Sequence, residues 1–270
     1  MSGDVNLKIS DVGVIAEADI DINKINVVGG VNSSGKSTAS KLLYCYLKSQ
    51  KSQSLESLIE NEGLENLNLE NVKFSSNATF TDIFYLESFS IFDLRDSQIF
   101  TLDHIKHIME CLDVQNQVQT PHTLSEILST LEDDCLNISS PGFKQIGVIR
   151  ILLENGSLKR DSFLIIDEPE SNLHPDWEIR FAEILVLLAK ELNITLYLNS
   201  YSPIFIEAIS LYSQYHDLIE KTNFYLTQKR DNGKYDFRKI NPKNMGDVYE
   251  NLTRSYDELD NLKAEILFRE

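Results

Sequence analysis

Gly30-Val31-Asn32-Ser33-Ser34-Gly35-Lys36-Ser37-Thr38 is the stretch that decides the fold of this chain. It follows the pattern G-x-x-x-x-G-K-[ST], in which the glycines let backbone N–H groups approach phosphate oxygens. In that pattern the lysine reaches the β and γ oxygens, and the next hydroxyl binds Mg²⁺. We predict phosphate contacts from Gly30, Asn32, Ser33, Ser34, Gly35, Lys36, Ser37 and Thr38. The stretch therefore predicts a site for ATP and magnesium.

The flanking residues supply the context that such a loop requires. Ile25-Asn26-Val27-Val28 is typical of a buried strand that leads into the loop. From Ser37 to about Ser49, apolar residues recur at i, i+3, i+4 and i+7, which predicts an amphipathic helix. The loop would then lie at a helix N-terminus, where the dipole and the N–H groups favour phosphate. The alternative is a chance match in a surface loop.

A second motif lies about 130 residues later. Phe163-Leu164-Ile165-Ile166 is typical of a strand buried on both faces of a parallel sheet, and Asp167 and Glu168 follow it. Ligands of open α/β sheets bind at the carboxyl ends of the strands. We expect Asp167 to orient Mg²⁺ and Glu168 to polarise the attacking water as general base. An acidic loop after a core strand is the alternative interpretation.

Together with the Gly30–Thr38 loop, Asp167-Glu168-Pro169-Glu170-Ser171-Asn172-Leu173-His174-Pro175 resembles the ATP-binding-cassette superfamily. More narrowly, it is similar to the RecF/SMC-like and overcoming-lysogenization-defect-like ATPases. The resemblance spans about Asn6 to Ile209. It implies a P-loop α/β fold with a mainly parallel mixed sheet, an N-terminal antiparallel layer and an inserted helical lobe. It also implies that Ser171–Pro175 is a D-loop at a dimer interface.

The same resemblance implies a signature segment that contacts the γ-phosphate held by the opposite subunit. Ile138–Gln145 occupies its place, and Ser139, Ser140 and Gly142 are the expected phosphate contacts. Pro141 departs from the family pattern, because proline fixes φ and removes one N–H. The alternative is a plain loop followed by an ordinary helix start, where serine and proline are favoured.

The switch segment departs from the family as well. Tyr201 stands where relatives carry histidine, after the expected strand Ile194–Tyr197. Its phenol can donate a hydrogen bond to the γ-phosphate but cannot act as an imidazolium. We therefore expect either a catalytic Tyr201 with slow turnover or a residue that only lines the pocket. The family's glutamine loop falls near Phe84–Ser88, and Gln98 is a weaker candidate.

Composition is consistent with one cytoplasmic ATPase domain. The 270 residues are 42% hydrophobic, which suffices for one core over 1–270. We expect an inserted, partly helical lobe at 50–140 and a C-terminal part at 204–270 that completes the domain. No apolar run is long enough to cross a membrane, and no signal peptide pattern is present. Three isolated cysteines argue against a disulfide framework or a zinc knuckle.

The charge is negative overall but uneven along the chain. A net charge of −17 opposes nonspecific attraction to nucleic acid. The segment 221–243 is the exception, with seven basic residues and two acids. It is typical of a hairpin in which Thr222–Gln228 and Tyr235–Ile240 flank an Asn232-Gly233 turn. It is either an anion-binding or partner-binding edge, or an edge strand whose lysines prevent aggregation.

Histidines give weaker indications. His104 and His107 have a spacing that could hold a metal on a helix, but no further ligands accompany them. We interpret them as ordinary surface or packing residues, and His174 as a structural residue.

The sequence thus favours an ATPase whose homodimer encloses two ATP·Mg²⁺, coupled to a partner or to nucleic acid. A nucleotide-gated binding module with little hydrolysis, acting with a separate effector, is the alternative, and Pro141 and Tyr201 motivate it. The motor subunit of a membrane transporter is a third, weaker interpretation. Fold analogy cannot choose the biological pathway.

Overall fold

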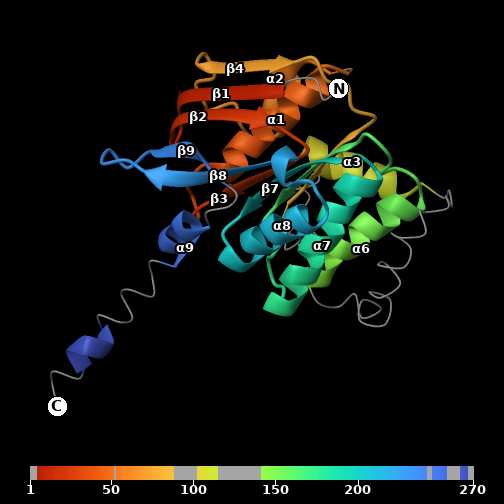
Figure 1. Ribbon diagram of the computed structural model, residues 1–270. Coiled ribbons are helices and arrows are strands. Elements are labelled where there is room, and N and C mark those ends of the chain that lie inside the picture. The colour runs from red at the N-terminus through yellow and green to blue at the C-terminus, as the bar shows by residue number, and fades with distance from the viewer. Residues whose placement is uncertain are drawn as a thin grey trace.

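A nine-stranded mixed sheet is the centre of the computed structural model, which describes residues 5–51, 53–87, 102–114, 141–241, 245–253 and 262–266 (Figure 1). The strand order is β4-β1-β2-β9-β8-β3-β7-β6-β5. The strands are β1 (Val5–Val12), β2 (Ile15–Ile22), β3 (Ile25–Gly29), β4 (Val72–Ser76), β5 (Ile83–Leu86), β6 (Phe163–Asp167), β7 (Thr195–Ser200), β8 (Thr222–Lys229) and β9 (Tyr235–Ile240).

The parallel part of the sheet brings the two sequence motifs together. β3 leads into the phosphate loop and pairs in parallel with β7 and with β8. β7 pairs with β6, and β6 with the edge strand β5. Gly29 lies opposite Ser200, and Asp167 lies opposite Asn199. The carboxyl ends of β3, β7 and β6 therefore lie side by side, as the predicted fold class requires.

Two antiparallel strands, β1 and β2, precede β3, as expected. β1 pairs with β2 and with β4, and residues of β1 alternate between buried and exposed sides. This alternation is typical of a sheet with one face on the core and one toward water. The turn after β1 places Ile15 against the phosphate loop, since a Cβ added to Gly35 would lie 2.5 Å from the Ile15 Cγ1.

The basic segment forms the expected hairpin but does not lie at an edge. β8 and β9 are antiparallel, and the chain turns at Asn232-Gly233. β8 also pairs with β3, and β9 pairs with β2, so the hairpin joins the antiparallel layer to the parallel part. The interpretation of its lysines as guards of an exposed edge strand is therefore wrong. The edges of the sheet are β4 and β5.

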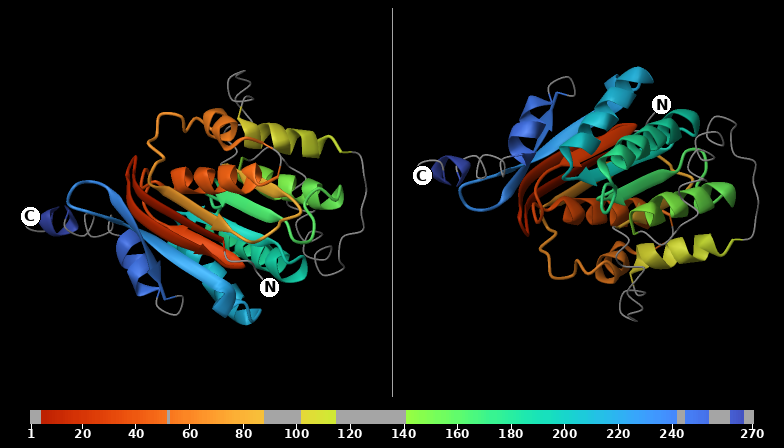
Figure 2. Two further views of the ribbon diagram at one scale, coloured as in Figure 1. Left: turned by 90° about the horizontal axis from the view of Figure 1, so that it is seen from above. Right: turned by 90° about the horizontal axis from the view of Figure 1, so that it is seen from below.

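Helices cover both faces of the sheet (Figure 2). α1 (Lys36–Ser49) and α2 (Leu55–Asn61) pack on one hydrophobic cluster, and α6 (Pro141–Glu154), α7 (Pro175–Glu191) and α8 (Pro203–Tyr215) pack on the other. α3 (Asp103–Leu112) lies beside β5. The predicted helix after the loop is confirmed; of its predicted apolar stripe, Ala39, Leu42 and Leu43 are buried and Tyr46 is half-buried.

The C-terminal part contains a short 3₁₀ turn (Ile219–Lys221) and α9 (Gly246–Leu252), and residues 262–266 are helical. The segment 50–140 supplies α2, α3 and both edge strands. Its expected division into core and helical lobe stays a prediction, because most of 88–140 lies outside the described residues, as does Gln98. Among the described residues, no helix has the length and apolar character needed to span a membrane.

Candidate functional site

The phosphate loop joins β3 to α1 and leaves the first turn of α1 without a side-chain cap. Gly35 is the N-cap residue, with φ of +94°, and no side chain bonds to the helix start. A Cβ on Gly30 would lie 1.8 Å from the Thr227 Oγ1, so only glycine fits beside β8. The helix N-terminus can thus offer backbone N–H groups to an anion.

Lys36 is folded into the loop. Its side chain is buried, and its Nζ donates to the carbonyl oxygens of Gly30 at 2.7 Å and Val31 at 2.9 Å. Burial lowers the pKa of Lys36, and the nearby carboxylates of Asp167, Glu168 and Glu170 oppose that shift. The ammonium therefore lies within an acidic site, where phosphate oxygens can replace the two carbonyl partners.

Asp167 is held from both sides at the end of β6. Its Oδ1 accepts from the Asn199 Nδ2 at 3.0 Å, and its Oδ2 accepts from the Tyr85 hydroxyl at 3.3 Å. Burial raises the pKa of Asp167, whereas hydrogen bonds from Ser37 and Asn199 lower it. The contact with Ser37 brings together the two residues that the sequence predicts to bind Mg²⁺. Their oxygen donors suit that hard cation.

Asn199 and Tyr85, which hydrogen-bond to Asp167, were not predicted as site residues from the sequence, and Ser40 connects them. The Asn199 Nδ2 also donates to the Ser40 Oγ at 2.9 Å, and the Ser40 Oγ lies 3.0 Å from the Tyr85 hydroxyl. All three side chains are buried. The sequence offered one signal for these residues: each is a polar residue within an apolar strand or helix. A buried polar side chain requires a hydrogen-bond partner, so such a position indicates a contact but not with which residue.

Glu168 is less constrained than Asp167. It is half-buried, its backbone has φ of +53°, and its Oε2 accepts from the Ser171 Oγ at 3.1 Å. A non-glycine residue in this left-handed region is strained by about 1 kcal/mol or more. The chain therefore leaves the extended conformation of β6 at Glu168.

Glu170, the second glutamate of the motif, anchors the switch segment. Its Oε1 accepts from the Ser200 Oγ at 2.8 Å, from the Tyr201 N–H at 2.7 Å and from the Ser202 N–H at 3.1 Å. Burial raises the pKa of Glu170 to about 7, although these donors oppose the shift. Sequence reasoning missed this role, because the three donors come from a segment 30 residues away.

Tyr201 follows β7 and lies near the carboxylates of Glu168 and Glu170. Its side chain hydrogen-bonds with Ser171, which donates to Glu168. Burial raises the pKa of Tyr201, so the phenol stays protonated near neutral pH. The structure therefore connects Tyr201 to Glu168 through Ser171. Whether Tyr201 takes part in catalysis stays a prediction.

The signature-like segment is described only in part. Ser139 and Ser140 lie outside the described residues, Pro141 is the first residue of α6, and Gly142 lies in its first turn. Proline suits this position, because its missing N–H would have no helical partner there. The Gln145 Nε2 donates to the Glu87 backbone oxygen at 3.4 Å. The start of α6 is thus tied to the residue that follows β5.

Glu87 belongs to a buried charge network beside Asp167, in the region expected for the glutamine loop. It pairs with the Lys41 ammonium at 2.6 Å and lies 3.6 Å from the His104 Nε2. Burial opposes ionisation, but His104 and Lys41 lower the pKa of Glu87 to about 2. His104 also bonds to Glu62, and both side chains are buried. His104 is therefore a packed ion-pair residue.

His174 has the structural role expected for it. Its Nδ1 accepts from the Asp176 N–H at 3.3 Å and caps α7, with Pro175 as the first helical residue. Four apolar residues of α7 that the sequence places on the core face are buried: Phe181, Ile184, Leu185 and Leu188. The cap fixes the segment between Glu168 and α7.

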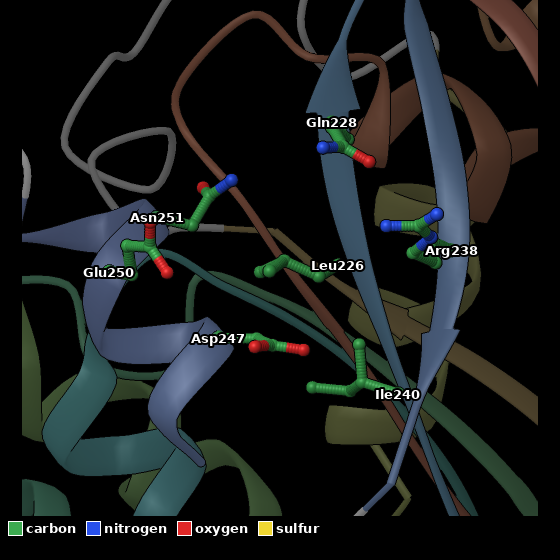
Figure 3. A pocket seen from close by; sticks show the side chains of 7 residues that line it. All are labelled: Leu226, Gln228, Arg238, Ile240, Asp247, Glu250 and Asn251. Carbon is green, nitrogen blue, oxygen red and sulfur yellow. The ribbon is translucent and has the colours of Figure 1, made fainter. Parts of the chain in front are cut away.

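The basic hairpin does not gather its charges into one anion site. Lys234 pairs with Asp11, and Arg230 pairs with Asp236 and Glu17. Arg238 lines a pocket of about 240 Å³ between the hairpin and α9 (Figure 3). Acidic side chains of α9 line the same pocket, so these described basic residues have carboxylates nearby. The pocket is lined by Leu226, Gln228, Arg238, Ile240, Asp247, Glu250 and Asn251.

The loop has a further feature that fits a bound phosphate. The Ser34 Oγ is buried and has no hydrogen-bond partner among the described residues. A buried hydroxyl without a partner is costly, and a ligand oxygen would satisfy it. With the uncapped helix, Lys36 and the Ser37–Asp167 pair, the residues fit ATP·Mg²⁺. Fold and site together have the features of a P-loop nucleotide-binding domain.

Residues 132–207 match the family described as "AAA domain, putative AbiEii toxin, Type IV TA system". No curated protein sequence matches the chain significantly.

Similar solved structures are distant in sequence. One is an ATP-binding cassette of an ABC transporter in its ADP conformation, with 12% identity, a TM-score of 0.47, and coverage of 94% of this chain and 96% of that chain. Another is cbiO1 from Clostridium perfringens, part of the ABC transporter complex cbiONQ. It has 15% identity and a TM-score of 0.46, and the match covers 99% of this chain and 100% of that chain. The SMC head domain from Thermotoga maritima has 13% identity and a TM-score of 0.45, and the match covers 89% of this chain and 99% of that chain.

Proposed function

We propose that this protein binds ATP·Mg²⁺ and hydrolyses ATP between two copies of the chain, and that nucleotide state controls a separate partner. The observation that carries the proposal is the arrangement at three neighbouring strand ends. The phosphate loop, the Asp167–Glu168 pair and the switch segment converge there, and Ser37 contacts Asp167. Magnesium would supply charge neutralisation of the phosphates when bound.

Each residue has a role that follows from its position. The N–H groups at the start of α1 and the Lys36 ammonium hold the phosphates, and Ser37 and Asp167 hold the cation. Asn199 and Tyr85 fix the Asp167 carboxylate, so that it does not have to reorganise on binding. Glu168 takes a proton from the attacking water. In such reactions positioning and electrostatics account for most of the rate.

A second copy of the chain would cover the open side of the loop. Asn32 and Ser33 are exposed at the tip of the loop, and the Ser171–Pro175 segment begins beside Glu168. We therefore place the dimer interface across these two segments. Ser139, Ser140 and Gly142 of the other subunit would approach the γ-phosphate, as the family resemblance implies.

Slow turnover is the alternative that Tyr201 favours. A neutral phenol can donate to a γ-phosphate oxygen but cannot add positive charge there. If hydrolysis is negligible, ATP acts as a ligand that gates assembly. Both versions use the same binding residues and differ in the rate of the chemical step.

A protein partner is favoured over nucleic acid. The net charge is −17, Arg230 and Lys234 of the hairpin are paired with acids, and Arg238 lines a pocket that acidic residues of α9 also line. The description of the matched family names a toxin–antitoxin system. We propose a separate effector protein as partner and the cytoplasm as location, where ATP and reduced thiols coexist.

The decisive experiment compares wild type with Glu168→Gln. We expect ATP turnover to fall at least 100-fold, because general-base catalysis contributes about 10²–10⁴, while ATP binding persists. Light scattering with ATP·Mg²⁺ should show a longer-lived dimer for the variant. Asp176→Asn, an exposed change in the next helix, is the matched control and should retain turnover.

Two results would contradict parts of the proposal. Normal turnover of Glu168→Gln would mean that Glu168 is not the base. ATP binding and dimerisation without wild-type turnover would favour the gated module instead.

A further inference from the structure

Three chemically different side chains meet beside the edge strand β5, away from the phosphate loop. The His107 Nε2 lies 3.2 Å from the Asp82 Oδ1, and the His107 Nδ1 lies 3.6 Å from the Cys111 Sγ. Asp82 directly precedes β5, and His107 and Cys111 are one turn apart on α3. The Phe84 ring packs edge-on against His107, with ring centroids 5.1 Å apart.

The order thiol, imidazole, carboxylate is compatible with two kinds of chemistry. A cysteine nucleophile needs a stabilised thiolate, usually beside positive charge or a helix N-terminus. Cys111 instead lies in the last turn of α3, at the negative end of the helix dipole. Burial and the carboxylates of Asp82 and Glu110 raise the pKa of the Cys111 thiol, whereas a hydrogen bond from Ser157 and the Lys48 ammonium oppose that shift. This environment argues against a nucleophile and favours a bound cation.

The donors suit a borderline-soft divalent metal. Zn²⁺ binds sulfur at about 2.3 Å and nitrogen or oxygen at about 2.0–2.2 Å, which places tetrahedral ligands roughly 3.3–3.6 Å apart. The three donor atoms already lie within 4.8 Å of one another. The two short contacts use different ring nitrogens, so His107 would rotate to present one nitrogen to the metal.

A fourth ligand position is accessible. His107 and Cys111 line a pocket of about 330 Å³, whose other charged lining residues are the acids Asp103 and Glu110 and the lysines Lys48, Lys51 and Lys106. Water in this pocket, or Glu110, can complete four-coordination. Lys48 is the competitor, because its Nζ lies 3.4 Å from the Asp82 Oδ1. Metal binding must displace this ammonium, which can turn toward the pocket that it lines.

We propose that Asp82, His107 and Cys111 bind a zinc-type divalent cation that joins α3 to the start of β5. The sequence interpretation paired His107 with His104, but His104 is buried in its contact with Glu62. The proposed metal site therefore combines His107 with Cys111, one turn later on α3, and with Asp82, which directly precedes β5. It does not depend on ATP hydrolysis by the chain.

Cobalt provides the test, because a thiolate bound to Co²⁺ gives a near-ultraviolet charge-transfer band. The full chain, stripped with a chelator and reduced, should develop this band on titration with Co²⁺ and lose it on addition of Zn²⁺. Cys111→Ser should abolish the band, and His107→Asn and Asp82→Asn should weaken Zn²⁺ binding at least tenfold. Cys45→Ala and Cys135→Ser are the matched controls and should retain the band.

Lys48→Met should strengthen Zn²⁺ binding, whereas the ligand variants weaken it. Removal of the competing ammonium should tighten Zn²⁺ binding severalfold if the metal takes the Asp82 oxygen. A band that survives Cys111→Ser, or that never appears, would overturn the proposal. Rapid alkylation of Cys111 by iodoacetamide that Zn²⁺ does not slow would also overturn it, and would indicate a nucleophilic cysteine.

Discussion

At the scale of single residues, the site is built from carboxylates that differ in their surroundings. Asp167 is buried and held by Asn199 and Tyr85, whereas Glu168 is half-buried and bonds only to neutral groups in the contacts described above. Glu170 is buried and accepts three hydrogen bonds from the switch segment. These environments differ among three nearby acids, and we propose metal binding for Asp167, proton transfer for Glu168 and a structural role for Glu170.

Glu170 should make stability depend on pH. Its pKa is raised from 4.5 to about 7, so between these values the folded state binds more protons than the unfolded state. Stability from this group is then fully present at low pH and decreases as pH rises through that window, by roughly 3 kcal/mol in total. Urea unfolding at pH 5 and pH 8 should show this decrease for wild type.

The matched variants isolate that contribution. Glu170→Gln keeps an acceptor for the Tyr201 and Ser202 N–H groups but cannot ionise, so its decrease from pH 5 to pH 8 should be smaller by about the same amount. Glu220→Gln, an exposed change, should follow wild type. An unchanged pH dependence in Glu170→Gln would show that another group is responsible.

At the scale of elements, helix caps fix the two segments that follow β6 and β7. Ser202 caps α8 by accepting from the Phe205 N–H, and its hydroxyl donates to Glu178 of α7. His174 caps α7. These caps set where the switch segment and the Ser171–Pro175 segment leave the sheet, and so they position Tyr201 relative to Glu168.

Ser202→Ala should be markedly destabilising. It removes a cap, which costs about 1 kcal/mol, and leaves the buried Glu178 carboxylate without this donor, which costs about 1–3 kcal/mol more. Chemical denaturation should show a loss of roughly 2–4 kcal/mol. Ser54→Ala removes the exposed cap of the short α2 and is the control, with an expected loss of about 1 kcal/mol or less. Equal losses would mean that the Glu178 contact contributes little.

The elements that the sequence predicts best are those with local signals. The Gly30–Thr38 loop, β6 with its carboxylates and α1 were predictable, because each depends on consecutive residues or on one helical period. The hairpin was also predictable from its Asn232-Gly233 turn. Its place in the sheet was not, because β9 pairs with β2, more than 200 residues earlier.

The same limit explains the missed site residues. Asn199, Tyr85 and Glu170 act through partners that the chain brings together only after folding. A polar residue in an apolar strand predicts that a partner exists, but the sequence does not identify it. The Asp82–His107–Cys111 cluster was hidden for the same reason.

At the scale of the whole molecule, net charge should oppose the proposed dimer. Each copy carries −17, so two copies repel each other unless the interface is locally complementary. The Debye length falls from about 30 Å at 0.01 M salt to about 8 Å at 0.15 M. Screening therefore weakens the long-range repulsion and should have little effect on apolar contacts and buried ATP contacts within the interface.

We accordingly expect the ATP·Mg²⁺-bound Glu168→Gln dimer to tighten as salt rises over that range, by roughly tenfold in Kd. Analytical ultracentrifugation at a series of protein concentrations would measure it. The nucleotide-free chain, as control, should remain monomeric at both salt concentrations, because screening alone supplies no attraction. A dimer that weakens with salt would instead indicate that complementary charges hold the interface, which would place basic residues such as those of the hairpin opposite acids of the other copy.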